Sequence, residues 1–143
     1  MTVSLKRVYD KPSRTDGTRI LVDRLWPRGL TKKSAAVDEW LRDVAPSNDL
    51  RKWFHSHVEA WPEFRKRYLK ELAGPEASEA LQRLYSAIAK GKVTLVFASK
   101  NAEQNNATIL KELLEGARKP PTGTGPAAAR AMRGRQAARA PRR

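Results

Sequence analysis

The chain contains no cysteine, and this absence excludes several classes of protein. Disulfide-stabilised folds, thiolate enzymes and cysteine-based zinc sites all depend on that side chain. The only histidines, His55 and His57, are two residues apart, and residues with this spacing do not share a face of a helix. We therefore expect no metal site and no cofactor.

Long apolar runs are also missing. The first ten residues, MTVSLKRVYD, lack the apolar stretch of a signal peptide. No segment approaches the roughly 20 apolar residues that a membrane-spanning helix needs. The chain also has no phosphate-cradling glycine loop and no nucleophile elbow. We expect a soluble cytoplasmic protein without a membrane partner, whose reaction no short motif identifies.

Acidic residues are absent from the last part of the chain. Its basic residues are Arg118, Lys119, Arg130, Arg133, Arg135, Arg139, Arg142 and Arg143. Subtracting these eight charges from the net charge of +14 leaves about +6 for residues 1–117. The composition after Lys119 has no apolar periodicity, so it buries too little apolar surface to offset its ordering entropy. We predict a folded domain over residues 1–117 and a disordered basic tail over residues 118–143.

Three segments of the folded part have the pattern of strands. Residues 3–9 alternate weakly, residues 18–25 begin with a β-branched apolar run, and residues 93–98 are apolar on both faces. The eight residues between the first two strands, 10–17, are too few for a crossover helix, so these strands are either antiparallel neighbours or not adjacent. The run Ile20–Val22 favours a central position for the second strand.

Residues 35–90 have the periodicity of helices. Apolar residues at helical spacing predict a helix that carries Val37 to Val44 and ends at Pro46, followed by a short helix capped by Ser47. Pro62 and Pro75 stand where further helices begin, and Gly91 where the last of these ends. A strand, a helical stretch and a strand form a crossover, which predicts that strands 18–25 and 93–98 are parallel. The fold class is therefore α/β, with a single compact domain and a small sheet of mixed direction flanked by helices.

The stretch Arg19–Gly29 changes without a break from a buried strand to charged residues and a turn. Asp23 beside Arg24 requires an explanation, because a charge on a buried strand is costly unless it is paired. A structural ion pair is one explanation, with Pro27 and Gly29 in a type I turn. A ligand site at the end of the strand is the other, since open α/β folds bind ligands there.

A set of side chains at the ends of these two strands forms the candidate site. Arginine binds carboxylate or phosphate through a planar fork, lysine adds a point charge, and a helix that starts after Asn101 would add N–H donors. We assign ligand binding to Arg24, Arg28, Ser99, Lys100 and Asn101. Asp23 is the candidate general base. Alternatively, Asn101 and Gln104 form a capping box that only starts the last helix.

Several motifs together resemble a known family. They are Arg7–Asp10 (RVYD), Arg19–Gly29 (RILVDRLWPRG), Asp38–Trp40 (DEW), Phe64 with Tyr68, Glu71–Leu72, Ser99–Asn101 (SKN) and Gln104–Ala107 (QNNA). Over residues 3 to about 116 the chain resembles the YeaO-like branch of domain of unknown function 488. The resemblance supports the fold and the pocket but implies no reaction. Asp and His are common in that family where this chain has Asn101 and Gln104, so we expect no catalytic role for a titratable group there.

Two functions remain open. The first is binding of a small anionic or nucleotide-like molecule at the carboxyl ends of the strands, with hydrolytic or transfer chemistry on it as an open extension. The second is a non-enzymatic association with nucleic acid, in which the basic tail binds weakly and without sequence preference.

Overall fold

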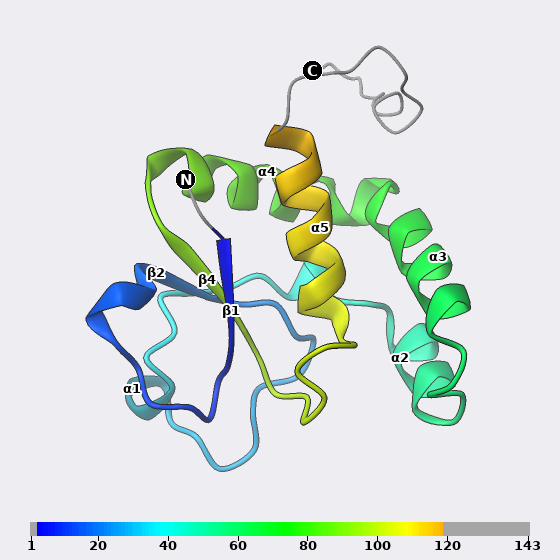
Figure 1. Cartoon of the computed structure of the whole chain (residues 1–143), viewed down its shortest axis with the longest axis horizontal. Helices are drawn as coiled ribbons and strands as arrows, with labels where there is room; N and C mark the ends of the chain where they lie inside the picture. The colour runs from blue at the N-terminus through cyan, green and yellow to red at the C-terminus, as the bar shows by residue number, and fades with distance from the viewer. Residues whose placement is uncertain (1–2, 119–143) are drawn as a thin grey trace. The chain divides into compact units, whose positions relative to one another are not determined.

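The computed structural model describes residues 3–118, of which residues up to Glu112 belong to one compact unit. At its centre is a sheet of four strands in the order β1-β4-β2-β3. Figure 1 labels β1, β4 and β2. The strands are β1 (Val3–Arg7), β2 (Thr18–Leu21), β3 (Glu39–Trp40) and β4 (Val93–Phe97). The predicted α/β class, a small sheet flanked by helices, is confirmed.

All three strand pairings are parallel, whereas the sequence suggested a sheet of mixed direction. The predicted crossover between β2 and β4 is confirmed, with Ile20 opposite Leu95. Strand β4 lies between β1 and β2, so the two N-terminal strands are the non-adjacent pair that the sequence allowed. Residues 8–17, which include the 3-10 helix η1 (Arg14–Asp16), return the chain to the other end of the sheet and so allow β2 to run parallel to β1.

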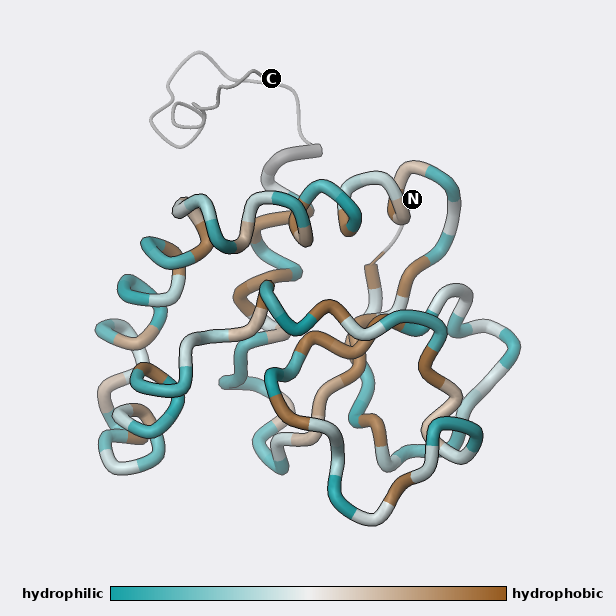
Figure 2. The backbone as a smooth tube through the Cα atoms, turned by 180° about the vertical axis from the view of Figure 1, so that it is seen from behind, coloured by the Kyte–Doolittle hydropathy of each residue, from teal (hydrophilic) through white to brown (hydrophobic). Residues whose placement is uncertain are grey.

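Strands β4 and β2 form the interior of the sheet because their residues are apolar on both faces. Every residue of β4 is buried, and Arg19, Ile20 and Leu21 of β2 are buried as well. In Figure 2 hydrophobic stretches lie where the strands cross the centre of the unit, and hydrophilic stretches follow the connecting loops. The predicted central position of the second strand is confirmed.

The helices begin and end close to the positions that the sequence indicates. They are α1 (Lys32–Ala35), η2 (Arg42–Val44), α2 (Asn48–His55), α3 (Trp61–Leu72), α4 (Pro75–Lys90) and α5 (Asn106–Arg118). The Ser47 hydroxyl accepts a hydrogen bond from the Leu50 N–H and so caps α2, as expected. Pro75 is the first residue of α4, and Gly91 follows its last. Helix α3 packs against both α2 and α4 (Figure 1).

The helix expected to carry Val37 to Val44 does not form. The short strand β3 and η2 occupy this segment instead. The backbone N–H of Leu41 donates to the Leu21 carbonyl, and the indole N–H of Trp40 donates to the Asp23 carbonyl. These bonds to the free edge of β2 hold the segment extended, so pairing with the sheet overrides the local apolar spacing.

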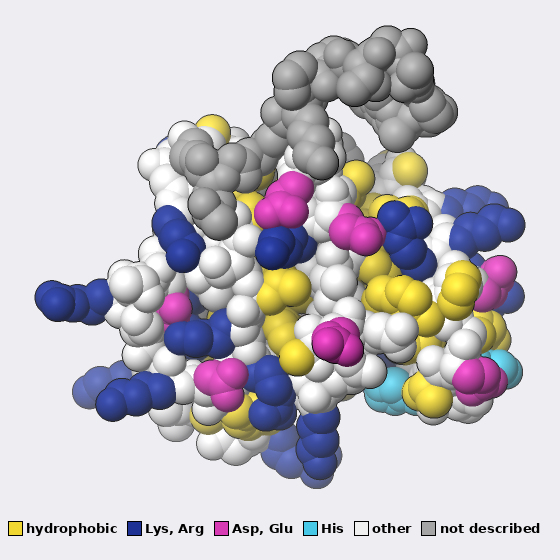
Figure 3. Space-filling model, in the orientation of Figure 1, with side chains coloured by type: hydrophobic (Ala, Val, Ile, Leu, Met, Phe, Trp, Pro, Cys, Tyr) yellow, Lys and Arg dark blue, Asp and Glu magenta, His cyan; other side chains and the backbone are white. Residues whose placement is uncertain are grey.

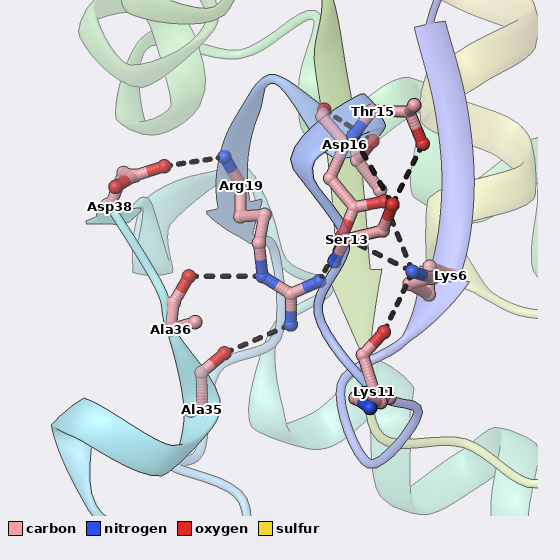
Figure 4. Close-up of polar contacts among 10 residues, drawn as sticks. Lys6, Lys11, Ser13, Thr15, Asp16, Arg19, Ala35, Ala36 and Asp38 are labelled. Atoms are coloured by element: carbon pink, nitrogen blue, oxygen red, sulfur yellow. Dashed lines mark hydrogen bonds and ion pairs between the residues drawn. The ribbon is translucent and has the colours of Figure 1, made fainter.

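Loops cover one face of the sheet. Val8, Leu21, Ala35 and Val96 form a small buried cluster there, with Trp26, Leu30, Val37, Trp40 and Ala98 packed against it. Beside this cluster lies the buried carboxylate of Asp16 (Figure 4). It accepts hydrogen bonds from Arg19 Nη1 at 2.7 Å, from Lys6 Nζ at 3.0 Å and from the Ser13 N–H at 3.0 Å. This network fastens the return segment to β1 and β2.

Arg19 has partners on two sides. Its guanidinium donates to Asp16 and also to the carbonyls of Ala36 and Ala35, each at 2.9 Å (Figure 4). The end of α1 is therefore joined to β2 and to the return segment by one side chain. Because all of these groups are buried or half-buried, the network is a structural anchor of the face that carries no long helix.

The basic tail expected over residues 118–143 lies, from residue 119 on, outside the described residues, and the domain boundary after residue 117 stays a prediction. Helix α5 extends to Arg118. Within the described part of the chain, no helix has both the length and the apolar character needed to cross a membrane.

Candidate functional site

The loops that follow β1, β2 and β4 meet at one edge of the sheet. Parallel strands end on the same side, and these loops lie together at the lower edge of the unit in Figure 1. Figure 3 shows Lys and Arg side chains gathered at this edge. The expectation that the carboxyl ends of the two central strands lie side by side is confirmed.

Asp23 connects two of these loops. Its Oδ2 accepts a hydrogen bond from the Ala98 N–H at 2.8 Å, and its Oδ1 accepts one from the side-chain amide of Asn106 at 3.1 Å. The same amide donates to the Val22 carbonyl at 2.8 Å. Asp23 therefore joins the end of β2 to the end of β4 and to the first residue of α5. We call these hydrogen bonds of Asp23 with Ala98 and Asn106 the Asp23 clasp.

The Asp23 carboxylate is half-buried and has no basic partner among the described residues. Burial raises the pKa of Asp23, and the hydrogen bonds from Ala98 and Asn106 oppose this rise. Among the residues that the structure describes, Asp23 takes part in no ion pair. The structural ion pair with Arg24 is therefore wrong as an explanation, because N–H groups satisfy both carboxylate oxygens.

Arg24 is engaged elsewhere. Its Nε donates to the Pro46 carbonyl at 3.0 Å and its Nη2 to the Ala45 carbonyl at 3.1 Å. These carbonyls follow η2 and offer acceptors that the helix does not use. Arg24 thus fixes the path of the chain after η2, and the structure does not place its guanidinium against Asp23.

A polar cluster that the sequence did not reveal lies next to Arg24. The buried hydroxyl of Tyr68 donates to the Val44 carbonyl, and Glu71 accepts hydrogen bonds from the N–H and the hydroxyl of Ser47 at 2.9 and 2.6 Å. Burial, and then the charges of Asp23 and Glu71, raise the pKa of Tyr68 well above its ordinary value. Sequence periodicity places Tyr68 on an apolar stripe of α3, so its hydroxyl could not be recognised as polar core.

This cluster borders a cavity of about 360 Å³. The polar residues that line it are Arg24, Asp43, Ser47, Asn48, Glu71 and Glu76. Three of these side chains are carboxylates, and Arg24 and Glu71 already have hydrogen-bond partners within the protein. The cavity is therefore predominantly acidic and differs in charge from the loop edge.

The predicted residues of the β4 loop shape that loop. The Ser99 hydroxyl accepts from the Asn101 N–H at 3.1 Å, and Asn101 Oδ1 accepts from the N–H groups of Glu103 and Gln104 at 3.0 and 2.9 Å. The predicted capping box does not start the last helix. Helix α5 begins at Asn106, and Asn105 caps it by accepting from the Thr108 N–H at 3.1 Å.

Arg28 and Lys100 are the exposed cations of the predicted set. The hydrogen bond from the Leu30 N–H to the Pro27 carbonyl closes the turn that carries Arg28, and Gly29 has a φ of 86°. The turn is thus shifted by one residue from the predicted type I turn, because glycine supplies the positive φ that a type II turn needs at its third position. The Tyr9 hydroxyl donates to the Arg28 carbonyl at 2.9 Å, which joins this turn to the loop after β1.

The structure therefore brings part of the predicted set together. Asp23 contacts the loop that carries Ser99, Lys100 and Asn101, whereas Arg24 turns towards η2. Asn106 is the partner of Asp23 that sequence reasoning missed, and only the adjacency of the two strand ends could have suggested it. Within residues 3–118, no group of three or more His, Asp or Glu side chains could hold a metal ion.

Comparison with known proteins finds the same family that the motifs indicate. A family model described as "Inactive DUF488-N3 subclade" matches residues 2–129. The chain is 46% identical to the "Uncharacterized protein YeaO" of Escherichia coli (strain K12) over 114 residues, which cover 80% of this chain and 97% of that protein. It is 40% identical to the "Uncharacterized protein Rv3073c" of Mycobacterium tuberculosis (strain ATCC 25618 / H37Rv), over 80% of this chain and 94% of that protein. No solved structure matches the chain significantly.

Proposed function

Because the chain belongs to the YeaO-like DUF488 family, we propose that it acts by binding, and that the loops after β1, β2 and β4 bind a small anion. The observation that carries this proposal is the Asp23 clasp, which holds the loop of Arg28 against the loop of Lys100. The description of the matching family model as inactive favours binding over catalysis.

The two exposed cations supply the attraction. Neither Arg28 nor Lys100 forms an ion pair with another described residue, so an anion from solvent would not compete with a carboxylate of the protein. Arginine offers a planar fork of donors and lysine a compact charge, a combination that suits phosphate or carboxylate. Ser99 and Asn101 set the shape of the loop that carries Lys100.

Asp23 positions this site instead of acting as its general base. Each oxygen of Asp23 accepts a hydrogen bond that links the end of β2 to another loop, so we assign Asp23 to holding the loops together. Arg24 fixes the chain after η2 through the carbonyls of Ala45 and Pro46 and has no contact with this site in the proposal. In this proposal the residues that touch the anion are Arg28 and Lys100.

Titration with inorganic pyrophosphate, followed by two-dimensional NMR of the full chain, tests the proposal. We expect saturable shifts at the backbone amides of residues 26, 28–30 and 98–101, and their loss in Arg28→Ala and Lys100→Ala. Lys92→Ala is the matched control, because it removes one exposed lysine beside the amino end of β4. Parent shifts that are absent, or that respond to Lys92→Ala as strongly as to Lys100→Ala, would refute the site.

The second candidate function is association with nucleic acid through the basic end of the chain. The observation that favours it is the charge of residues 119–143, which include seven basic residues, Lys119 and the six arginines that follow it, and no acid. These residues lie outside the described structure. Their binding would be electrostatic and would weaken with salt, in contrast to a shaped anion site.

A further inference from the structure

Tyr9 lies beside the proposed anion site and is exposed to solvent. The exposed fraction of Tyr9 is 43%, although Tyr9 comes directly after the edge strand β1 and the buried Val8. Leu25, with 58% of its surface exposed, is on the loop that also carries Arg28. Only one other large hydrophobic side chain of the described residues is exposed, so two of the three lie on these loops.

The ring of Tyr9 is held at two places. Its hydroxyl donates to the Arg28 carbonyl at 2.9 Å, and the guanidinium of Arg7 lies over the ring at 5.2 Å from its centre. Arg7 is itself fixed, because its Nε donates to the Ser99 carbonyl at 2.9 Å and its Nη2 to the Ala98 carbonyl at 3.3 Å. The aromatic surface that remains open to solvent is therefore presented in a defined orientation.

From these contacts we propose that Tyr9 is a stacking platform for a nucleobase, and that the anion bound at Arg28 and Lys100 is the phosphate of the same nucleotide. This inference rests on the proposed anion site and specifies its ligand. An aromatic ring that is fixed, exposed and close to free cations is the arrangement by which proteins hold a base and its phosphate without reading the sequence. The arginine below the ring adds a cation–π contact that keeps the ring in place.

The geometry connects the two halves of the ligand site. The Tyr9 hydroxyl is bonded to the main chain of Arg28, so the ring lies beside the turn that carries Arg28. Arg7 is tethered to the main chain of Ser99, the residue before Lys100. Base and phosphate would thus contact the loops after β1, β2 and β4 together.

The experiment compares ligands with and without a base on the full chain. Affinities for 5′-AMP and for ribose 5-phosphate are measured by calorimetry with the parent, Tyr9→Leu and Tyr9→Phe. We expect the parent to prefer 5′-AMP and Tyr9→Leu to lose this preference. Stacking of one base corresponds to a loss of about 5-fold to 150-fold on removal of the ring. Tyr9→Phe keeps the ring and should keep most of the preference.

A single-stranded oligo(dA) forms a second arm, which distinguishes a free nucleotide from one nucleotide of a strand. All variants share the same basic C-terminal segment, so a difference between parent and Tyr9→Leu is due to residue 9. A base preference that depends on Tyr9 in either arm supports the inference, and the arm that shows it identifies the source of the ligand. Upfield shifts of the Tyr9 ring protons on binding would report the stacking directly.

The experiment distinguishes failure of the nucleobase inference from failure of the anion site. If ribose 5-phosphate binds and Lys100→Ala abolishes this binding, but no base preference depends on Tyr9, the anion site stands and the nucleobase inference is wrong. If Tyr9→Leu weakens ribose 5-phosphate and 5′-AMP equally, the ring only supports the loop and the inference is also wrong. If neither small ligand nor oligo(dA) binds in a way that depends on Arg28 and Lys100, the anion site itself is refuted.

Discussion

The pKa values of two carboxylates, the buried Asp16 and the half-buried Asp23, shift in opposite directions because their partners differ. Burial tends to raise the pKa of Asp16, but the Ser13 N–H, Lys6 and Arg19 outweigh burial and lower it. Asp23 accepts hydrogen bonds from neutral groups alone, and for Asp23 burial prevails. At the scale of single residues, the charge of the partner therefore decides whether a buried acid favours folding at neutral or at acid pH.

The first prediction concerns Asp23→Asn. The folded-state pKa of Asp23 is raised, so the native state binds more protons than the unfolded state in the range just above pH 3.8. The stability that Asp23 contributes is therefore fully present below this range and is lost as the pH rises through the folded pKa. Urea unfolding between pH 3 and pH 7 should show that the advantage of the parent over Asp23→Asn shrinks with rising pH. A difference that is constant or grows with pH contradicts this.

The second prediction concerns Asp16→Ala. Arg19 is almost fully buried, and removal of Asp16 leaves its charge with carbonyl partners alone. We expect the free energy of unfolding to fall by roughly 3–5 kcal/mol, the usual cost of stranding a buried charge. Glu63→Ala is the control, because it breaks an exposed ion pair with Arg67 and should leave the melting temperature nearly unchanged.

The pH dependence of the Asp16 variant gives a separate check. Because the pKa of Asp16 is lowered, its contribution is present above pH 3.8 and is lost as the pH falls through the folded value. The difference in unfolding free energy between parent and Asp16→Ala should therefore shrink in acid. The Asp23→Asn difference is expected to change with pH in the opposite direction. If both differences had the same slope against pH, the hydrogen-bond partners assigned to the two carboxylates would be wrong.

At the scale of elements, the sequence predicts the helices and strands that are determined by neighbouring residues along the chain. The β-branched run of β4, the Ser47 cap of α2 and the Pro75 start of α4 depend on neighbouring residues, and each appears in the structure. The segment 37–45 depends on a partner far along the chain. Its apolar spacing suggests a helix, but the free edge of β2 takes it as a strand, which local periodicity cannot report.

In the candidate site, too, some residue positions could be predicted from the sequence and others could not. The crossover rule places the ends of β2 and β4 side by side, and this suffices to bring Asp23 to the β4 loop. The direction of Arg24 depends on the carbonyls of Ala45 and Pro46, whose position follows from tertiary packing. The roles of Asn106 and Tyr9 could not be predicted for the same reason, since their hydrogen-bond partners come from distant loops.

The third prediction tests the return segment between β1 and β2. Gly17 has a φ of 68°, and a Cβ atom at this position would lie 2.3 Å from the Lys92 carbonyl oxygen. Gly17→Ala should therefore lower the melting temperature strongly, because its backbone conformation costs about 1–3 kcal/mol for a residue with a side chain. Displacing the start of β4 adds a further cost. Gly116→Ala is the control, because its Cβ meets nothing and alanine favours the helix. A milder effect for Gly17→Ala than for Gly116→Ala would contradict this close approach.

At the scale of the whole molecule, the net charge has two sources. Seven basic residues and no acids in residues 119–143 account for half of the net charge of +14. The other half belongs to the rest of the chain, where Arg28 and Lys100 lie on the loop edge. Polyanion binding measured on the full chain therefore combines two contributions. One is the general electrostatic attraction of residues 119–143, and the other is binding by a few side chains at the loop edge. A chain that ends at Arg118 separates them.

The fourth prediction is that the shortened chain, residues 1–118, keeps the anion site but loses most of its affinity for long polyanions. Its melting temperature should match that of the full chain if residues 119–143 contribute no packing. For single-stranded DNA, the slope of log affinity against log salt should become less steep by as much as about 5, since each phosphate neutralised on a single strand contributes about 0.7 to the slope. Pyrophosphate titration should still shift the amides of residues 98–101, because the Asp23 clasp is retained.

Two outcomes would contradict this prediction. An unchanged salt slope would exclude the basic segment from polyanion binding, and loss of the pyrophosphate response would place the anion site in that segment and not at the strand ends.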